Sequence, residues 1–146
     1  MNPAVIVAQD ALAQAFMRQA DPRWQHILAN IELKPLDTML YFDTLAFAIV
    51  PADDGYEDAS IVPDEETMAA VRDLRDAMAL ASGQAPWSAM EIKIDPPGEY
   101  HLTFSYEPGK RVEGKHDYES YYRFNTYVSD WAAQRAPQAP HREGGQ

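Results

Sequence analysis

The sequence predicts an α+β fold: an antiparallel sheet of about four strands with helices packed on it. Apolar residues recur at helical spacing in some segments and alternate in others, and turn residues separate these segments. Hairpins joined by a helix favour an antiparallel sheet, so the predicted element order is α-β-β-α-β-β-α. Residues 1–135 are expected to form one domain, because a chain of 146 residues has the usual size of a single domain. Residues 136–146 are expected to be a disordered C-terminal tail, since they lack large apolar side chains.

The first helix is expected over residues 3–20. Pro3 suits the first turn of a helix, and Asp21 with Pro22 ends it because the residue before proline leaves the α region. The apolar residues between them have the spacing of one helical face: Val5, Ala8, Leu12, Ala15 and Phe16.

Residues 24–33 and 38–50 are expected to form two strands joined by a turn at residues 34–37. In the first strand, four apolar residues alternate onto one face: Ile27, Ala29, Ile31 and Leu33. The second strand is apolar on both faces, which predicts a central strand that is covered on both sides. Asp43 interrupts this strand and is interpreted as a structural acid. It is either buried with a partner, because a buried carboxylate without one is costly, or exposed on an edge bend.

Residues 51–63 are expected to form an acidic loop, and residues 64–82 a second helix. Asp64 suits the N-cap, Glu65 and Glu66 complement the helix N-terminus, and Gly83 ends the helix. The buried stripe of this helix is expected to be Met68, Val71, Leu74 and Met78.

A second hairpin is expected from residue 87 to residue 106. Three residues of its first strand share one face: Met90, Ile92 and Ile94. After a turn at residues 95–98, the return strand alternates: Tyr100, Leu102, Phe104 and Tyr106. Glu91 and Glu99 lie on the paired strands and could face each other across this hairpin, but both are interpreted as solvent-facing partners of residues such as Lys93.

Residues 107–117 are expected to form a polar loop, and residues 118–134 a last helix. Within the loop, residues 110–113 are interpreted as an exposed turn, although their basic residues could hold one anion. Four residues at helical spacing are expected to face the core, with Tyr127 on the same side: Tyr121, Phe124, Val128 and Trp131. Tyr118 and Tyr122 lie off this stripe, so they are candidates for an interface.

The formal net charge of −11 indicates which classes of partner the protein avoids. Phosphate backbones and anionic membranes repel such a surface, so neither nucleic acid nor a membrane is an expected partner. No apolar segment approaches the roughly 20 residues of a membrane-spanning helix, and the N-terminus lacks the pattern of a signal peptide. The absence of cysteine favours a reducing compartment, and a cytoplasmic location is expected.

The acids are concentrated in one part of the chain. Between residues 35 and 71 there are nine acids and no lysine or arginine: Asp37, Asp43, Asp53, Asp54, Glu57, Asp58, Asp64, Glu65 and Glu66. Such asymmetry can steer a basic partner toward the acidic surface, although it can also serve only solubility.

Motifs of catalysis are missing, so no catalytic residue, metal ligand or cofactor is predicted. The four histidines lack metal-ligand spacing, and the sequence contains neither a G-x-S-x-G elbow nor a glycine-rich nucleotide loop. His26 and His101 could point to the same side of the sheet, where a solvated or locally hydrogen-bonded pair is the simplest interpretation.

The second hairpin resembles the YezG-like immunity proteins of bacterial toxin systems. The similar residues are the strand Trp87–Ile94, the turn ending in Gly98, and a return strand that ends in Tyr106 and Glu107. The turn through Pro96 and Pro97 and the loop at residues 107–117 depart from the family's pattern. The resemblance implies an antitoxin: a protein that binds a toxin domain, often a nuclease, and masks its active site in the cytoplasm of the producing cell.

Under this resemblance, the acidic surface is expected to bind the lysines and arginines of the toxin. The expected partner-binding residues are Asp53, Asp54, Glu57, Asp58, Glu65 and Glu66, with Tyr56 as an aromatic anchor among them. A homodimer is also compatible with the sequence. Two other functions stay open at this stage: a ligand-binding domain or enzyme with an aromatic pocket around His26, Asp43 or His101, and a homo-oligomeric adaptor.

Overall fold

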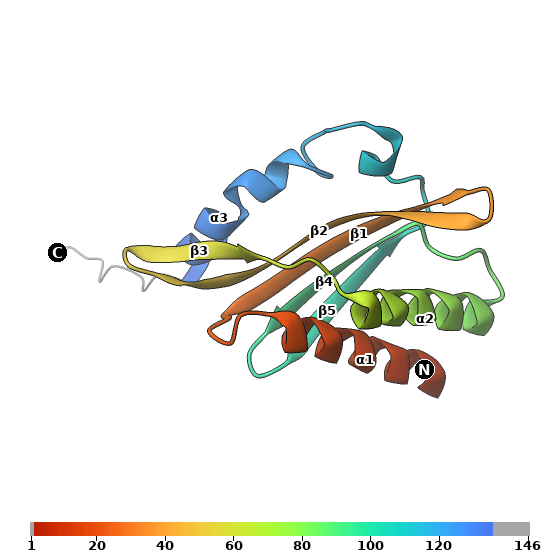
Figure 1. The fold of residues 1–146 in the computed structure, drawn as a ribbon, viewed down its shortest axis with the longest axis horizontal. Helices are drawn as coiled ribbons and strands as arrows, with labels where there is room; N and C mark the ends of the chain where they lie inside the picture. Colours follow the sequence, from red (N-terminus) through yellow and green to blue (C-terminus); the bar gives the residue numbers. More distant parts are fainter. Residues whose placement is uncertain (1, 136–146) are drawn as a thin grey trace.

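A five-stranded antiparallel sheet forms the centre of the molecule, with the strand order β3-β2-β1-β4-β5. The computed structural model describes residues 2–135, so the predicted tail at residues 136–146 lies outside the described residues. The elements follow the chain as α1 (Pro3–Gln19), β1 (His26–Leu36), β2 (Met39–Ala52), β3 (Gly55–Ser60), α2 (Glu65–Ser82), β4 (Ala89–Asp95), β5 (Glu99–Ser105), the short 3-10 helices η1 (Arg111–Glu113) and η2 (Tyr122–Thr126), and α3 (Tyr127–Arg135) (Figure 1). The predicted α+β class and the predicted order of helices and strands are confirmed, apart from one additional strand.

The additional strand is β3, which lies where the sequence predicts a loop at residues 51–63. It pairs with the second half of β2, from Phe47 opposite Ser60 to Ala52 opposite Gly55. The strand is polar and exposed along almost its whole length. Backbone pairing to a long neighbouring strand therefore holds it, and its side chains carry no apolar alternation that could reveal it in the sequence.

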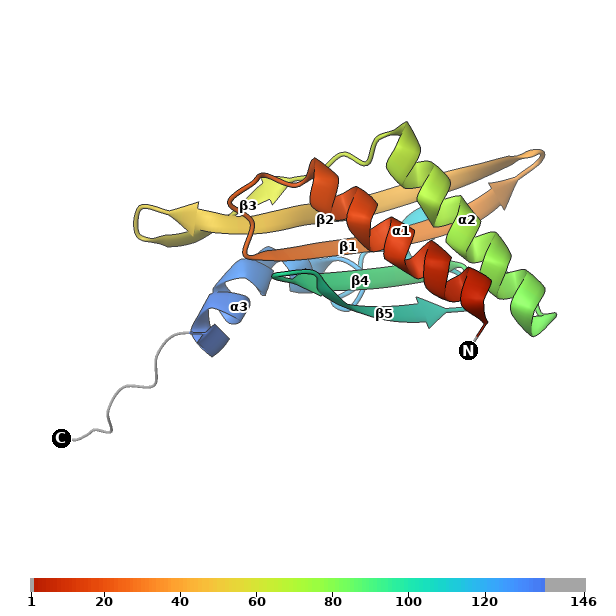
Figure 2. The same ribbon diagram turned by 90° about the horizontal axis from the view of Figure 1, so that it is seen from below.

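Helices α1 and α2 lie side by side on one face of the sheet (Figures 1 and 2). The apolar faces predicted for α1, α2, β1 and the second hairpin meet between the helices and the sheet. Its fully buried side chains include Leu12, Phe16, Ile27, Ile31, Leu74, Trp87, Ile92 and Ile94. Burial of these side chains is the main stabilising contribution in this half of the molecule.

Both long helices begin and end within one residue of their predicted bounds, and side chains cap both of their N-termini. The N–H of Ala4 donates to the Asn2 side chain at 2.8 Å, and the N–H of Thr67 donates to Oδ1 of Asp64 at 2.8 Å. Gly83 ends α2 in the left-handed region with a φ of 69°, which favours glycine because other side chains are strained there. No helix within residues 2–135 is long and apolar enough to cross a membrane.

The segment from Tyr106 to Arg135 covers the opposite face of the sheet (Figure 1). Leu28, Phe47 and Ile49 of the sheet pack there against Phe124 and Trp131. This second core confirms the prediction that β2 is covered on both sides.

The predicted helix over residues 118–134 is wrong in its first half. An Asp117 side chain that accepts from the backbone N–H of Ser120 at 2.9 Å holds a turn there, and Tyr121 leaves helical geometry with φ −143°. The 3-10 turns of η2 then change the residue spacing before α3 begins at Tyr127. As a result Phe124 and Trp131 are buried as expected, whereas Tyr121 is exposed.

The second hairpin differs from its prediction in two details. Glu91 lies opposite Thr103, and Glu99 lies opposite Asp95, so the two glutamates do not face each other. Glu91 is mostly buried and pairs with Arg123, which corrects its assignment as a solvent-facing acid. Tyr106 follows the end of β5 and is exposed.

Candidate functional site

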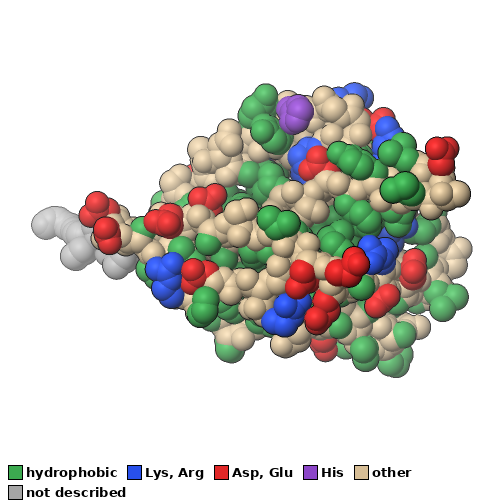
Figure 3. Space-filling model, viewed as in Figure 1, with side chains coloured by type: hydrophobic (Ala, Val, Ile, Leu, Met, Phe, Trp, Pro, Cys, Tyr) green, Lys and Arg blue, Asp and Glu red, His purple; other side chains and the backbone are tan. Residues whose placement is uncertain are grey.

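The turn between β2 and β3, together with β3 itself, forms an acidic hairpin at one end of the molecule. It carries the carboxylates of Asp53, Asp54, Glu57 and Asp58, all of which are exposed. Figure 3 shows acidic side chains at this end of the molecule. Within residues 2–135, none of these four carboxylates lies within ion-pair distance of a lysine, arginine or histidine. The acidic hairpin is therefore a concentrated negative surface, and none of its four carboxylates forms an ion pair within the described part of the chain; Arg23 interacts with Glu57 only at longer range.

Tyr56 connects the acidic hairpin to the last helix. Its ring packs edge-on against the Trp131 ring, with the ring centroids 5.0 Å apart, and the residue is 42% exposed. Trp131 in turn lies under the guanidinium group of Arg135, 4.6 Å from the ring centroid. Tyr56 thus combines a fixed position with an accessible surface, as an aromatic anchor of an interface needs.

Two grooves border β3 and meet at Asp58, Phe124 and Asn125. The hairpin groove, of about 710 Å³, lies between the acidic hairpin and α3, and its lining includes Tyr56, Glu57, Val128 and Ala132. The edge groove, of about 700 Å³, continues past the end of β3, and its lining is mostly apolar. The acidic hairpin therefore borders a surface that also offers apolar contacts.

The other predicted partner-binding residues lie elsewhere. Glu65 and Glu66 are in the first turn of α2, where Glu66 pairs with Arg18 at 3.6 Å. Tyr118 and Tyr122 are exposed as expected, but they belong to the segment after β5, which covers the face of the sheet opposite α1 and α2. The structure therefore brings together Asp53, Asp54, Tyr56, Glu57 and Asp58, and it does not bring the remaining four residues into the same hairpin.

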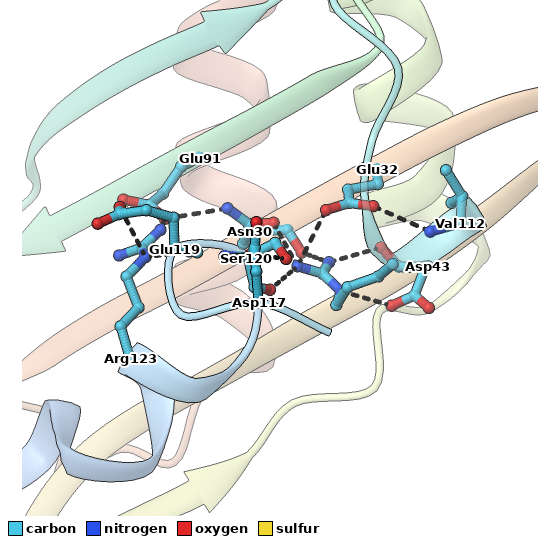
Figure 4. Close-up of polar contacts among 10 residues, drawn as sticks. Asn30, Glu32, Asp43, Glu91, Val112, Asp117, Glu119, Ser120 and Arg123 are labelled. Atoms are coloured by element: carbon cyan, nitrogen blue, oxygen red, sulfur yellow. Dashed lines mark hydrogen bonds and ion pairs between the residues drawn. The ribbon is translucent and has the colours of Figure 1, made fainter. Parts of the chain in front are cut away.

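A buried polar cluster around Arg111 lies between the sheet and the segment after β5 (Figure 4). The Arg111 guanidinium donates to Oδ1 of Asp43 at 2.9 Å and to Oδ1 of Asn30 at 2.8 Å, and it lies 3.4 Å from Glu32. Its side chain is only 3% exposed. The predicted exposed turn at residues 110–113 is therefore wrong, since its arginine is enclosed by two acids of the sheet. These contacts agree with the interpretation of Asp43 as a structural acid and, of its two alternatives, favour the paired one.

Gly109 allows the loop to approach this cluster. A Cβ atom at position 109 would lie 2.5 Å from Oε1 of Glu32, closer than any real Cβ contact. The same Glu32 oxygen accepts the backbone N–H of Val112 at 3.1 Å. The cluster extends to Arg123 through Glu91 and Asn30, whose amide donates to Glu91 at 3.0 Å. Its geometry fixes the C-terminal segment on the sheet, because nearly every polar group has a partner.

A second polar group joins β1, the end of β4 and α3. His26 is 4% exposed; its Nδ1 lies 2.8 Å from Oδ1 of Asp95, and its Nε2 lies 2.9 Å from the hydroxyl of Tyr127. Burial lowers the pKa of His26, against the raising effect of Asp95, and burial raises the pKa of Tyr127 to about 12. Both groups are therefore neutral near pH 7, and the tyrosine is not activated as a nucleophile or an acid. The arrangement anchors α3 to the sheet.

The residues of the aromatic-pocket hypothesis are not brought together. Asp43 belongs to the Arg111 cluster, His26 pairs with Asp95, and His101 is exposed on β5. No group of three or more acids and histidines within the described residues is arranged to hold a metal ion.

The stability of the protein is expected to fall as the pH decreases below about 6.5, in part because of His26. Its folded-state pKa is lowered from 6.5 by burial, with Arg135 and Lys93 adding to the effect. The unfolded chain therefore binds the proton first as pH falls, and this favours unfolding. Urea unfolding of the His26→Gln variant should show a weaker pH dependence than the wild type over this range. The matched variant His101→Gln, at an exposed histidine, should keep the wild-type dependence; an equal slope in all three proteins would contradict the assignment.

Neither a model of a known protein family nor a curated protein sequence matches this chain.

Proposed function

We propose that this protein is an immunity protein that binds a basic toxin domain through the acidic hairpin and thereby neutralises the toxin in the cytoplasm. The observation that carries the proposal is the set of four exposed, unpaired carboxylates beside Tyr56: Asp53, Asp54, Glu57 and Asp58. A concentrated negative field of this kind accelerates association with a protein of opposite charge. The resemblance of the second hairpin to YezG-like immunity proteins points in the same direction.

The proposed mechanism is occlusion without any chemical step. A nuclease site that binds phosphate presents lysine and arginine side chains, and the carboxylates of the hairpin compete for the same groups. Tyr56 supplies an apolar contact at the centre of the charged surface, where water is excluded from the surrounding ion pairs. Its contact with Trp131 holds the tyrosine in place before binding, so little side-chain entropy is lost.

The first experiment is co-expression with toxin-like open reading frames encoded beside the gene. One of them should be lethal alone, harmless together with this protein, and recovered with it in a pull-down. Association kinetics of that pair should then depend steeply on salt, because exposed charges are screened within about 10 Å at 0.1 M salt. Absence of a toxic neighbour and of a co-purifying protein would contradict the proposal.

The acidic hairpin is tested by removing its four charges without changing side-chain size. The variant is Asp53→Asn, Asp54→Asn, Glu57→Gln and Asp58→Asn. The association rate constant with the toxin is expected to fall by about 10- to 1,000-fold, because electrostatic steering supplies that range.

A matched control removes the same number of charges from exposed acids outside the hairpin: Asp73→Asn, Asp76→Asn, Glu99→Gln and Glu107→Gln. Both variants have the same net charge, so only the position of the charge differs between them. Equal losses in the two variants would assign the effect to overall charge and would reject the hairpin as the binding surface.

A further inference from the structure

Strand β2 is much longer than the strand that pairs with its outer edge. It runs over 14 residues, whereas β3 has 6 and pairs only with residues 47–52 of β2. The N–H of Ile61 donates to the carbonyl of Ala46 at 2.9 Å, just after β3 ends. Beyond this bond, no strand of the described part of the chain pairs with the outer edge of residues 39–45.

The backbone groups of Phe42 and Thr44 point to this open edge. Alternate residues of an antiparallel strand direct their N–H and C=O groups to opposite neighbours. Ala46, Ala48 and Val50 face β3, so Phe42 and Thr44 face the same side, where β3 has already ended. They offer donors and acceptors in the arrangement that a further strand needs.

The open edge forms the floor of the edge groove. The lining of this groove is largely apolar and includes Phe42, Thr44, Phe47, Ile61, Met68 and Phe124. Figure 3 looks onto this side of the molecule and shows hydrophobic side chains in the middle of the face, between the α1/α2 layer and the C-terminal segment. The edge continues to Tyr41 and Met39, which are 47% and 71% exposed. An exposed apolar strand edge of this kind is a typical site of strand addition.

We infer that an extended segment of the toxin adds as a strand to the open edge of β2, within the edge groove and in line with β3. This inference rests on the proposed function. Strand addition obtains affinity from main-chain hydrogen bonds and specificity from the pockets that receive alternate side chains. A toxin segment that fits this groove has apolar residues in alternation with lysine or arginine. The apolar residues enter the groove.

Charge selects this occupant over a second copy of the chain. Asp58 borders both the edge groove and the hairpin groove, so a bound segment reaches the acidic hairpin at one end. The carboxylates of the acidic hairpin attract a basic segment at this position. A second copy, with its net charge of −11, is repelled by the same acids.

Amide hydrogen exchange tests the inference on the wild-type protein, alone and bound to the toxin-like protein that co-purifies in the co-expression experiment. The amides of Phe42 and Thr44 are expected to exchange at least about 100-fold more slowly in the complex, since new backbone hydrogen bonds protect them. The amides of Leu102 and Phe104, on the outer edge of β5, serve as the internal control and are expected to keep their exchange rates.

A pair of matched variants separates the groove from the hairpin. Thr44→Arg places a large cation in the edge groove and is expected to raise the dissociation rate constant at least about tenfold, with an association rate constant close to that of the wild type. Thr103→Arg makes the same change on β5, at the other edge of the sheet, and should leave both constants unchanged.

The outcomes are distinguishable. A complex in which Phe42 and Thr44 exchange as in the free protein overturns this inference and leaves the proposed function standing. Absence of any complex overturns both. Protection of these amides in the isolated protein that increases with its concentration would identify a second copy as the occupant, which also overturns the inference.

Discussion

Replacing Arg111 by methionine is expected to lower the free energy of unfolding by about 3–5 kcal/mol, because it leaves the buried carboxylate of Glu32 without its counter-charge. The Glu32 side chain is 5% exposed and lies 3.4 Å from the guanidinium. Asp43 and Asn30 lose hydrogen bonds of 2.9 Å and 2.8 Å at the same time. Methionine fills part of the space of the arginine stem, so the loss reports mainly on charge and hydrogen bonding.

Urea unfolding at pH 7 measures this effect. Lys110→Met is the matched control: the neighbouring lysine is 56% exposed and lies 3.7 Å from Asp117, and exposed pairs contribute at most about 1 kcal/mol. Adding Glu32→Gln to Arg111→Met is expected to recover part of the lost stability, because it removes one uncompensated buried charge. Equal stabilities of the Arg111 and Lys110 variants would show that the cluster does not hold the C-terminal segment on the sheet.

Replacing Trp87 by alanine is expected to lower the free energy of unfolding by about 3–5 kcal/mol, because it leaves a cavity in the core under α1 and α2. Trp87 is fully buried, and its ring packs against Phe104 with the centroids 5.4 Å apart. Thermal and urea unfolding both detect a change of this size. Trp24→Ala, at a half-buried tryptophan against the same core, is expected to cost less.

Trp87→Phe provides the second comparison. The Nε1–H group of Trp87 is buried, and it has no hydrogen-bond partner among the described residues. Phenylalanine keeps most of the aromatic contact and removes this unpaired donor, so the variant should retain most of the stability. A loss in Trp87→Phe as large as in Trp87→Ala would contradict this expectation and would mean that the site needs the full volume of the indole ring.

The predictable parts of the fold are those whose sequence signals and tertiary contacts agree. α1 and α2 have apolar faces and capping residues at both of their N-termini, and the predicted bounds differ from the observed ones by a single residue. The alternation of Ile27, Ala29 and Ile31 gives the face of β1 that packs under α1 and α2, while Leu28 on the other face is buried in the second core. In these segments, local periodicity is the direct result of packing against one layer.

The missed parts depend on contacts between distant segments. β3 has no apolar alternation because it is an edge strand with both faces largely exposed. The burial of Arg111 depends on Glu32 and Asp43, which lie on two other strands. The presence of these two acids within apolar strands indicates that a basic partner is needed, but the sequence does not show which lysine or arginine reaches them. Charge predicts a binding surface at residues 53–58, in a segment that the sequence indicates as a loop. The edge groove beside it is lined by residues distant in the sequence, such as Phe124 and Met68, so the sequence does not reveal it.

The carboxylates on β3 also influence how the molecule behaves at high concentration. An unpaired strand edge is a template for stacking of identical chains into fibrils, and charged residues on the edge are a common protection against it. Glu57 and Asp58 lie on this edge strand, and the acids of two copies repel each other. The acids proposed for recognition thus also oppose aggregation of the chain. Neutralising them is therefore expected to weaken binding and to lower colloidal stability at the same time.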